Sequence, residues 1–393
     1  MSTSSSLTPR PTRRTRIVCI SDTHNSTVKL PKGDVLIHAG DLTNQGSYSE
    51  LSKAVQWLEK ADFEAKIVIA GNHDITLDHD FYLKHGSSFH NQTPQDPAKC
   101  LSLFTSSRTI TYLQNESATV RLTKPGGPGT EFTIFGSPYS PQYGTWAFMY
   151  PHSTSQEPES ADSANTAAEL WAAIPPTTDI LVTHTPPYSH CDDACGCGEL
   201  QKTLAKVRPR LHVCGHVHQG RGAERVRWDT DRLTTEDEAA AEASVEAWED
   251  PNPDPSSAKI SLVDLTARGG KRPLDFTNAA QPVGDMPEHL PDPLAQRFPC
   301  ASSHAGPGAQ DRVGPGDPEA RVGNPDSALA VEHGGAISES MGQPAAAAAA
   351  TDRTGRRETC VVNCAIVATG WPHTGGKRFN KPIVVDLDLP VWS

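Results

Sequence analysis

Long apolar segments are missing from this sequence of 393 residues. No stretch approaches the ~20 apolar residues that a helix needs to cross a bilayer, so we expect a soluble protein with no membrane partner. The N-terminal stretch Met1 to Arg16 has no apolar core and is therefore not a secretory signal. Because it is rich in Ser, Thr and Arg and has no acidic residue, we interpret residues 1–15 as a disordered tail, with a mitochondrial transit peptide as the alternative.

Positive charge and regular cysteine spacing are also scarce. The chain has 35 Lys and Arg against 47 Asp and Glu, a formal net charge of -12, so we expect no general nucleic-acid binding. Its nine cysteines form no recognisable framework, which favours a reducing compartment and a cytoplasmic location. Cys191, Cys195 and Cys197 follow His190, but no second cysteine pair stands at a spacing that suits zinc, so we interpret them as loop thiols.

Composition divides the chain into a part rich in short apolar runs and a part of low complexity. Hydrophobic residues make up only 36% of it, while proline (33) and glycine (30) are frequent. Residues 229–358 are dominated by Ala, Pro, Gly, Asp, Glu and Ser and include the run Ala345–Ala350. Apolar periodicity is nearly absent there except around Lys259–Leu265, so we predict a disordered insertion that could recruit protein partners. Its acidic stretch Glu236–Glu249 is interpreted as solvated, with a transient helix as the alternative.

Short apolar runs predict buried strands in the rest of the chain. They are Ile17–Ile20, Val35–Ile37, Lys66–Ala70, Phe132–Phe135, Ile180–Val182 and Leu211–Cys214, followed after the insertion by Thr359–Ala368 and Pro382–Leu387. Between the second and third runs, Ser49–Lys60 has helical spacing, and Ser47 with Glu50 would form its capping box. Strand, helix and strand at this distance predict a parallel pair in an α/β fold. We therefore predict one domain made of residues 16–228 plus 359–390.

Polar side chains stand directly after five of these runs. They are Asp22 and His24, then Asp41, then Asn72, His73 and Asp74, then His184, and finally His216 and His218. Ligands in α/β proteins bind at the carboxyl ends of the strands, so these side chains are expected to meet. Asp, Asn and His suit Mn, Fe, Zn or Mg better than a thiolate site does. Their number is too large for one ion and suits two ions that share a carboxylate.

Each of these elements is weak evidence alone. An isolated Asp-x-His or His-x-His is more often an ordinary loop, and a lone Gly-Asn-His-Asp is more often a turn. Their joint occurrence in this order, each at a strand end, favours a metal site. His38 would support the carboxylate of Asp41, or it is simply a buried histidine bonded to the backbone.

The ordered motifs resemble those of the calcineurin-like metallophosphoesterase superfamily. The motifs that carry this resemblance are Asp22-x-His24, Gly40-Asp41, Gly71-Asn72-His73-Asp74, His184 and Gly215-His216-x-His218. The chain is more narrowly similar to the metallophosphoesterase-domain-containing subgroup. That similarity rests on Leu36–Thr43, Gly136–Tyr139, Thr145–Phe148, Thr183–Pro187 and Asn380–Val384.

The resemblance implies a four-layer αββα sandwich of two mixed sheets and a site with two divalent metal ions. The implied ligands are Asp22, His24, His218 and Asp41 for one ion, and Asp41, Asn72, His184 and His216 for the other. His73, beside the second ion, would give a proton to the leaving oxygen or steady the equatorial oxygens of the phosphate, and Asp74 would orient it. Asn72, His73, Tyr139 and Trp146 would contact the substrate, with loop packing as the alternative for the aromatic residues.

The implied activity is hydrolysis of a phosphate ester by a hydroxide that bridges the two ions and attacks phosphorus in line. The subgroup points to a phosphodiesterase acting on a small phosphodiester or a nucleotide. A phosphomonoesterase acting on nucleotides or phosphoproteins is the first alternative. The second alternative is a nucleotide- or partner-binding scaffold with vestigial activity. Loss of a metal ligand would indicate such a scaffold, and no ligand position is missing in this sequence.

Overall fold

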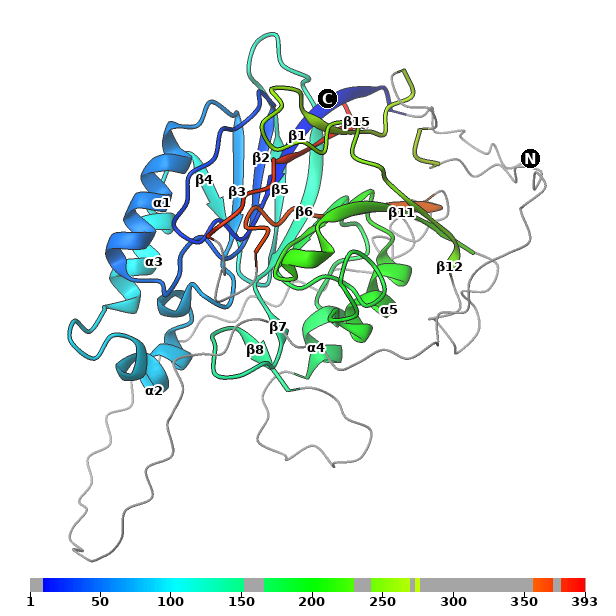
Figure 1. The fold of residues 1–393 in the computed structure, drawn as a ribbon. Coiled ribbons are helices and arrows are strands. Elements are labelled where there is room, and N and C mark those ends of the chain that lie inside the picture. The colour runs from blue at the N-terminus through cyan, green and yellow to red at the C-terminus, as the bar shows by residue number, and fades with distance from the viewer. Residues whose placement is uncertain are drawn as a thin grey trace, which may run out of the picture.

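Two β-sheets pack face to face in this protein, and helices cover the outer face of each (Figure 1). The computed structural model describes residues 10–151, 166–229, 242–268, 273–275, 356–369 and 376–392. Within these ranges the predicted four-layer αββα sandwich is confirmed.

The first sheet combines parallel and antiparallel strands. Across it, the described strands follow the order β13 (Ser261–Asp264), β15 (Ile383–Pro390), β1 (Thr12–Ile20), β2 (Val35–Ala39), β3 (Ala65–Ile69) and β4 (Ile110–Tyr112). Strands β1 to β4 run parallel, whereas β15 runs antiparallel to β1. The pairing of β2 with β3 confirms the predicted parallel pair.

The second sheet is also mixed. Its described strands follow the order β12 (Glu242–Ala247), β11 (Gly222–Trp228), β14 (Glu358–Asn363), β10 (Leu211–Cys214), β9 (Ile180–Thr183), β6 (Glu131–Ser137) and β5 (Glu116–Arg121). Strands β6, β9, β10 and β14 run parallel at its centre. A separate short pair joins β7 (Ser140–Pro141) to β8 (Met149–Tyr150).

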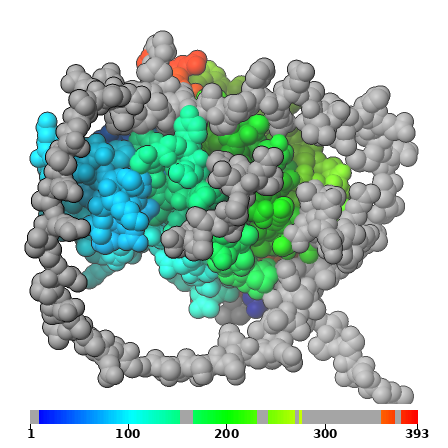
Figure 2. All heavy atoms as spheres, turned by 90° about the horizontal axis from the view of Figure 1, so that it is seen from below, coloured from blue at the N-terminus to red at the C-terminus, as the bar shows by residue number. Residues whose placement is uncertain are grey.

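The helices form the two outer layers. They are α1 (Tyr48–Lys60), α2 (His79–Phe89), α3 (Pro97–Thr105), α4 (Ala167–Ala172) and α5 (Gly198–Val207), with 3-10 turns at Ile75–Leu77 and His218–Gly220. Helices α1 and α3 pack on the first sheet, while α4 and α5 pack on the second. Figure 2 shows the light-blue and green segments that carry these helices on opposite sides of one face. None of the helices in the described ranges has the length and apolar content that crossing a membrane requires.

The central core explains why the strands were visible in the sequence. Ile17, Ile37 and Val213 face inward between the two sheets, whereas Val18 and Ile20 pack toward the helices of the first layer. Both faces of these strands are therefore covered, which requires apolar residues at nearly every position. The predicted capping box of α1 is also present, with Ser47 and Glu50 bonded reciprocally.

The structure corrects two predicted boundaries. Strand β1 begins at Thr12, inside the predicted tail of residues 1–15, because Thr12 to Cys19 pair with β15. Residues 229–358 contain two strands, although they were predicted to be disordered throughout. Strand β12 pairs with β11, and β13 pairs with β15, so hydrogen bonds to established strands stabilise segments of weak apolar pattern. The stretch Glu236–Glu249 thus holds a strand where a transient helix was the alternative.

The last two strands complete different sheets. They were predicted as two strands that follow the insertion, and the structure places β14 in the second sheet and β15 in the first. Residues 1–9 of the predicted tail and residues 276–355 of the predicted insertion, with Ala345–Ala350, lie outside the described residues.

Candidate metal centre

Five strands bring the predicted ligands to one edge of the two sheets. The loops after β1, β2 and β3 carry Asp22, Asp41 and Asn72, and the loops after β9 and β10 carry His184 and His218. All five side chains are buried. Because the strands are parallel and end together, residues separated by almost 200 positions become neighbours.

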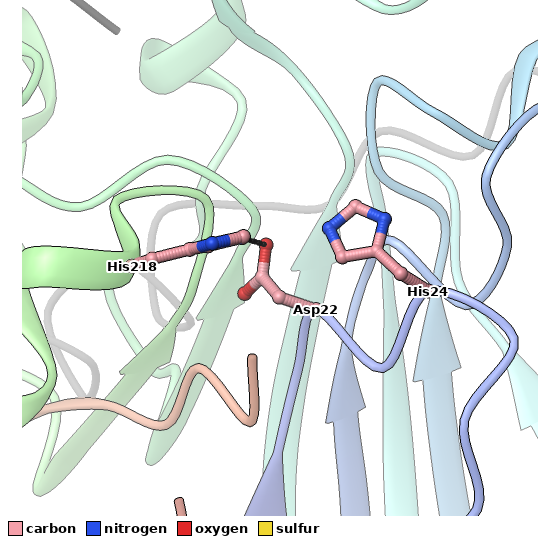
Figure 3. A group of neighbouring side chains, drawn as sticks. All are labelled: Asp22, His24 and His218. Atoms are coloured by element: carbon pink, nitrogen blue, oxygen red, sulfur yellow. Dashed lines mark ion pairs between the residues drawn. The ribbon is translucent and has the colours of Figure 1, made fainter. Parts of the chain in front are cut away.

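Asp22, His24 and His218 form the first donor group (Figure 3). Their ligand atoms all lie within 4.8 Å of one another, and His218 Nε2 is 3.4 Å from Asp22 Oδ1. In Figure 3 Asp22 lies between the two imidazole rings, which come from opposite sides of it. The structure therefore assembles three of the residues predicted for the first ion.

Asp41 lies between the two halves of the site. One of its carboxylate oxygens is 3.7 Å from His24 Nε2, and the other is 3.4 Å from His184 Nε2. It belongs to two further donor groups, one with His24 and His73 and one with Asp22 and His184. Asp41 therefore lies beside donors of both groups, and its sharing between two ions, which the resemblance implies, stays a prediction.

His184 and Asn72 lie together on the other side of Asp41. His184 Nε2 is 3.0 Å from Asn72 Oδ1, and His184 Nδ1 is 2.9 Å from the Ala39 carbonyl oxygen. A carbonyl at Nδ1 selects the tautomer that carries its proton there, which leaves the Nε2 lone pair for a metal ion. The two side chains are thus arranged as a pair of ligands.

His216 takes a less central position. Its backbone amide donates to the Asp22 carboxylate at 3.0 and 3.1 Å, and its ring centroid is 4.9 Å from that of His184. Within the described part of the chain, the three donor groups do not include His216. Its ligation of the second ion therefore stays a prediction, although its ring lies beside a residue predicted for that ion.

The backbone at the site is strained and tightly packed. Asp22, Asp41 and His216 have φ values of 51°, 54° and 66°, in the left-handed region that such residues rarely adopt. A Cβ atom on Gly71 would lie 2.3 Å from Asp41 Oδ1, and one on Gly215 would lie 2.3 Å from Asp22 Oδ2. These glycines leave the space in which the two carboxylates sit, and buried carboxylates beside imidazoles fit divalent metal ions.

The carboxylates and histidines are electrostatically coupled. Burial opposes ionisation of Asp41, but the charge of His184 outweighs it and holds the pKa of Asp41 well below its usual range. Burial likewise lowers the pKa of His184, yet Asp41 raises it to about 9. Burial keeps the pKa of His24 well below its usual value, so this imidazole stays neutral. A divalent cation would displace the proton from His184, because a ligating imidazole must be neutral.

His73 is oriented differently from what the sequence predicts. Its Nδ1 is 2.9 Å from the Asn44 carbonyl oxygen, whereas Asp74 accepts hydrogen bonds from the amides of Leu42, Thr43 and Gly71 and from the Thr43 hydroxyl. The prediction that Asp74 orients His73 is therefore corrected. Asp74 joins the loops after β2 and β3, and a backbone carbonyl is the orienting partner.

His73 also lies nearer the first ion's ligands than predicted. Its ring centroid is 4.8 Å from that of His24 at an interplanar angle of 87°, and its backbone amide donates to Asp41 Oδ1 at 2.9 Å. The prediction had placed His73 beside the second ion. The ring of His73 lies beside His24, a residue predicted for the first ion.

The aromatic residues predicted to contact substrate are largely packed inside the protein. Trp146 is 7% exposed, and its ring centroid is 4.1 Å from that of His73. Tyr139 is half-buried and packs edge-on against the fully buried Phe148. Loop packing, the alternative to substrate contact, thus accounts for Phe148, and Trp146 contacts a predicted catalytic residue.

Several contacts near the site were not predicted from the sequence. His38 Nε2 is 3.0 Å from the Thr23 hydroxyl, a side-chain contact where a backbone partner or Asp41 was expected. Lys377 Nζ donates to the His24 carbonyl oxygen at 3.2 Å, and the backbone carbonyls of Ala39 and Asn44 orient two histidines. Carbonyl groups occur at every residue, so they leave no sequence signal.

Two of the three predicted loop thiols are buried, and the third is not a thiol, because Cys195 is disulfide-bonded. Cys191 and Cys197 are buried, and Cys197 Sγ accepts hydrogen bonds from the Leu200 amide and from Trp171 Nε1. Cys197 therefore caps helix α5, and the two thiols are packed into the protein. Within the described ranges, no donor group contains a cysteine.

Comparisons with known proteins agree with this geometry. Residues 15–220 match the family model of the calcineurin-like phosphoesterases. The chain is 42% identical over 217 residues to a probable rhamnogalacturonate lyase C of Emericella nidulans, covering 54% of this chain and 18% of that protein. It is 38% identical over 230 residues to human metallophosphoesterase domain-containing protein 1, covering 54% of this chain and 64% of that protein.

A third relative is covered more fully. The chain is 31% identical over 229 residues to a UPF0046 protein of Caenorhabditis elegans, covering 55% of this chain and 73% of that protein. The match to the family model extends over more than half of the chain and includes every ligand position predicted from the sequence. The chain therefore belongs to the calcineurin-like phosphoesterase family, in the subgroup of the metallophosphoesterase-domain-containing proteins.

Proposed function

We propose that this protein is a phosphodiesterase that uses two divalent metal ions. The observation that carries the proposal is the position of Asp41, whose two oxygens face His24 on one side and His184 on the other. A carboxylate shared in this way is what a pair of closely spaced ions requires. Family membership supports phosphate ester hydrolysis, and human metallophosphoesterase domain-containing protein 1 supports the subgroup.

The first ion would be held by Asp22, His24, His218 and Asp41, and the second by Asp41, Asn72, His184 and His216. When bound, two such ions lower the pKa of water and withdraw charge from the phosphoryl oxygens. We propose only that the ions are divalent and belong to the group Mn, Fe, Zn and Mg, since all four accept carboxylate and imidazole ligands.

The chain itself supplies orientation and a proton. The Ala39 carbonyl holds His184 with Nε2 toward Asn72, and the Asn44 carbonyl holds His73 by Nδ1. His73 would give a proton from Nε2 to the leaving oxygen. This proton matters most when the leaving group would otherwise depart as a strongly basic alkoxide. Burial of the carboxylates and imidazoles excludes water and strengthens these interactions.

Metal-dependent turnover of the purified full chain tests the proposal. Protein stripped with a chelator and then given Mn²⁺ should hydrolyse bis-p-nitrophenyl phosphate faster than p-nitrophenyl phosphate. Faster hydrolysis of the monoester would favour a phosphomonoesterase. Absence of turnover with every metal tried, together with equal nucleotide binding by wild type and Asn72→Ala, would favour the binding scaffold.

A further inference from the structure

Trp146 covers one face of the His73 imidazole. The two ring centroids are 4.1 Å apart with an interplanar angle of 33°, so the rings are in close contact at a tilt. Asn72 anchors the segment that carries Trp146, because the amide of the next residue, Ala147, donates to the Asn72 carbonyl at 3.3 Å. Trp146 is therefore in contact with His73, the predicted proton donor, and its segment is hydrogen-bonded to Asn72, a predicted metal ligand.

Trp146 is itself supported from behind. Phe89, the last residue of α2, lies 5.4 Å from Trp146 between ring centroids, and His24 lies 4.8 Å from His73 on the other side. Four rings thus form a row that runs from α2 to the metal centre. Because Trp146 is only 7% exposed, most of its surface is occupied by the protein and little is left for a nucleobase or an aryl group.

We propose that Trp146 is a positioning residue for His73, an inference that rests on the proposed phosphodiesterase function. The Asn44 carbonyl holds Nδ1, and Trp146 blocks rotation of the imidazole toward α2. Together they select the rotamer and the tautomer in which Nε2 exchanges the proton. Misplacement of a catalytic group by a fraction of an ångström is costly, since proton transfer needs a short, aligned hydrogen bond.

The proton balance gives this inference a specific signature. As an oxygen from water bonds to phosphorus and the phosphorus–oxygen bond to the leaving group breaks, His73 would give a proton from Nε2 to the departing oxygen and regain one from solvent in the next cycle. A p-nitrophenolate leaves easily as an anion, whereas a phenolate is a stronger base and depends more on that proton. Loss of positioning should therefore slow a substrate with a poor leaving group more than one with a good leaving group.

The experiment compares Trp146→Leu and Trp146→Phe with wild type on two diesters of similar shape, bis-p-nitrophenyl phosphate and diphenyl phosphate. Trp146→Leu should lower kcat for diphenyl phosphate about 10- to 100-fold, lower kcat for the nitrophenyl diester only a few-fold, and leave both KM values unchanged. Trp146→Phe should recover most of the loss, because a phenyl ring also covers the imidazole face. The matched control is Trp57→Leu. Trp57 lies in α1 and packs against the hydrophobic cluster that contains Trp146, and its replacement should leave both kcat values unchanged.

A second readout does not depend on turnover. The indole ring current should shift the Cε1–H resonance of His73 upfield in metal-free protein, and Trp146→Leu should move it toward the position of an exposed histidine. His73→Gln identifies that resonance among the 16 histidines.

Four outcomes would overturn the inference. A loss confined to KM would make Trp146 a substrate contact, and equal losses for both diesters would make it only structural. An unchanged His73 resonance in Trp146→Leu, in an active wild-type protein, would remove the positioning role alone. Wild-type protein that is inactive with every metal overturns the proposed function and the positioning role with it, whatever the resonance shows.

Discussion

At the scale of single residues, Asp41 has the most demanding position. It is buried, its backbone lies in the left-handed region, and each carboxylate oxygen faces a different histidine. Such a residue is costly to maintain unless its charge is used, because a buried carboxylate must be compensated. A divalent cation on each side would provide that compensation.

Replacing Asp41 should therefore affect both ions at once. We expect Asp41→Asn to lower kcat by more than about 100-fold, since residues that only support metal ligands already cost 10- to 100-fold. Metal analysis of the purified protein should show loss at both sites, whereas His24→Ala should deplete mainly one. Equal depletion of both sites by His24→Ala would contradict the shared position of Asp41.

Gly71 shows how a residue without a side chain contributes to the site. A methyl group there would meet Asp41 Oδ1 at 2.3 Å and His184 Cε1 at 2.7 Å. We expect Gly71→Ala to displace both ligands, to destabilise the fold by about 1–3 kcal/mol and to reduce bound metal. Thermal unfolding and metal analysis would measure the two effects.

Gly198 provides the control for that substitution. It is the first residue of α5, and a Cβ atom there meets nothing within 4 Å. Gly198→Ala should leave metal content unchanged and preserve or slightly raise stability, because alanine favours helices. If both variants lost metal equally, the steric account of Gly71 would fail.

At the scale of elements, the loop after β9 is held against the second sheet by a buried histidine. His190 Nδ1 is 3.0 Å from Glu224 of β11, and its Nε2 is 3.0 Å from Glu242 of β12. Burial lowers the pKa of His190, but the hydrogen bonds to the two carboxylates outweigh it and raise the pKa to about 9. The charged imidazole thus connects the loop that follows His184 to strand β12.

This contact should make stability depend on pH in a defined direction. Because the folded-state pKa of about 9 exceeds the unfolded value of about 6.5, the stabilisation is complete below pH 6.5 and is lost as pH rises through 9. We expect His190→Gln to lower the free energy of unfolding by about 1–3 kcal/mol at pH 6 and by clearly less at pH 10. Urea unfolding of both proteins at the two pH values would measure this difference.

An exposed histidine serves as the control for His190. His79 lies on the surface at the start of α2, and His79→Gln should leave the free energy of unfolding unchanged at both pH values. A wild-type advantage over His190→Gln that grew from pH 6 to pH 10 would contradict the charged state assigned to His190.

At the scale of the whole molecule, the residues that flank the stretch 276–355 on either side lie close together. The amide of Arg357 donates to the Asp275 carbonyl at 3.2 Å, so the ends of the stretch 276–355 are neighbours. A short linker can therefore close the gap at a modest entropic cost. The residues before this stretch, in contrast, belong to the packed structure, because β12 and β13 pair with strands of both sheets.

Two deletions should consequently differ. Removing 276–355 and joining the ends with a few glycines should leave a folded protein with wild-type metal content and kcat. Removing 229–358 should destabilise the protein, because it also removes β12 and β13. Circular dichroism, thermal unfolding and turnover would measure the effects, and a stable, active product of the longer deletion would show that both strands are dispensable.

The sequence by itself determined the elements whose signals are local. Buried strands such as β10 need apolar residues at nearly every position, a capping box needs Ser47 and Glu50 three positions apart, and ligands such as Asp22 follow strand ends directly. These patterns predicted an α/β fold with the ligand residues together at the strand ends, whereas the two packed sheets were implied only by the family resemblance. None of them requires knowledge of a distant segment.

Only the tertiary structure decided the contacts between distant segments. Pairing with β11 stabilises β12, whose own sequence buries too little apolar surface to predict a strand, and pairing with β15 stabilises β13, of which only a short apolar pattern around Lys259–Leu265 gave a sign. The Asn44 carbonyl orients His73 in place of Asp74, and Trp146 covers its ring from a loop more than 70 residues away. Hydrogen bonds to carbonyls and ring packing depend on how the loops meet in space, so the strand ends revealed the metal ligands but not what holds them and His73 in place.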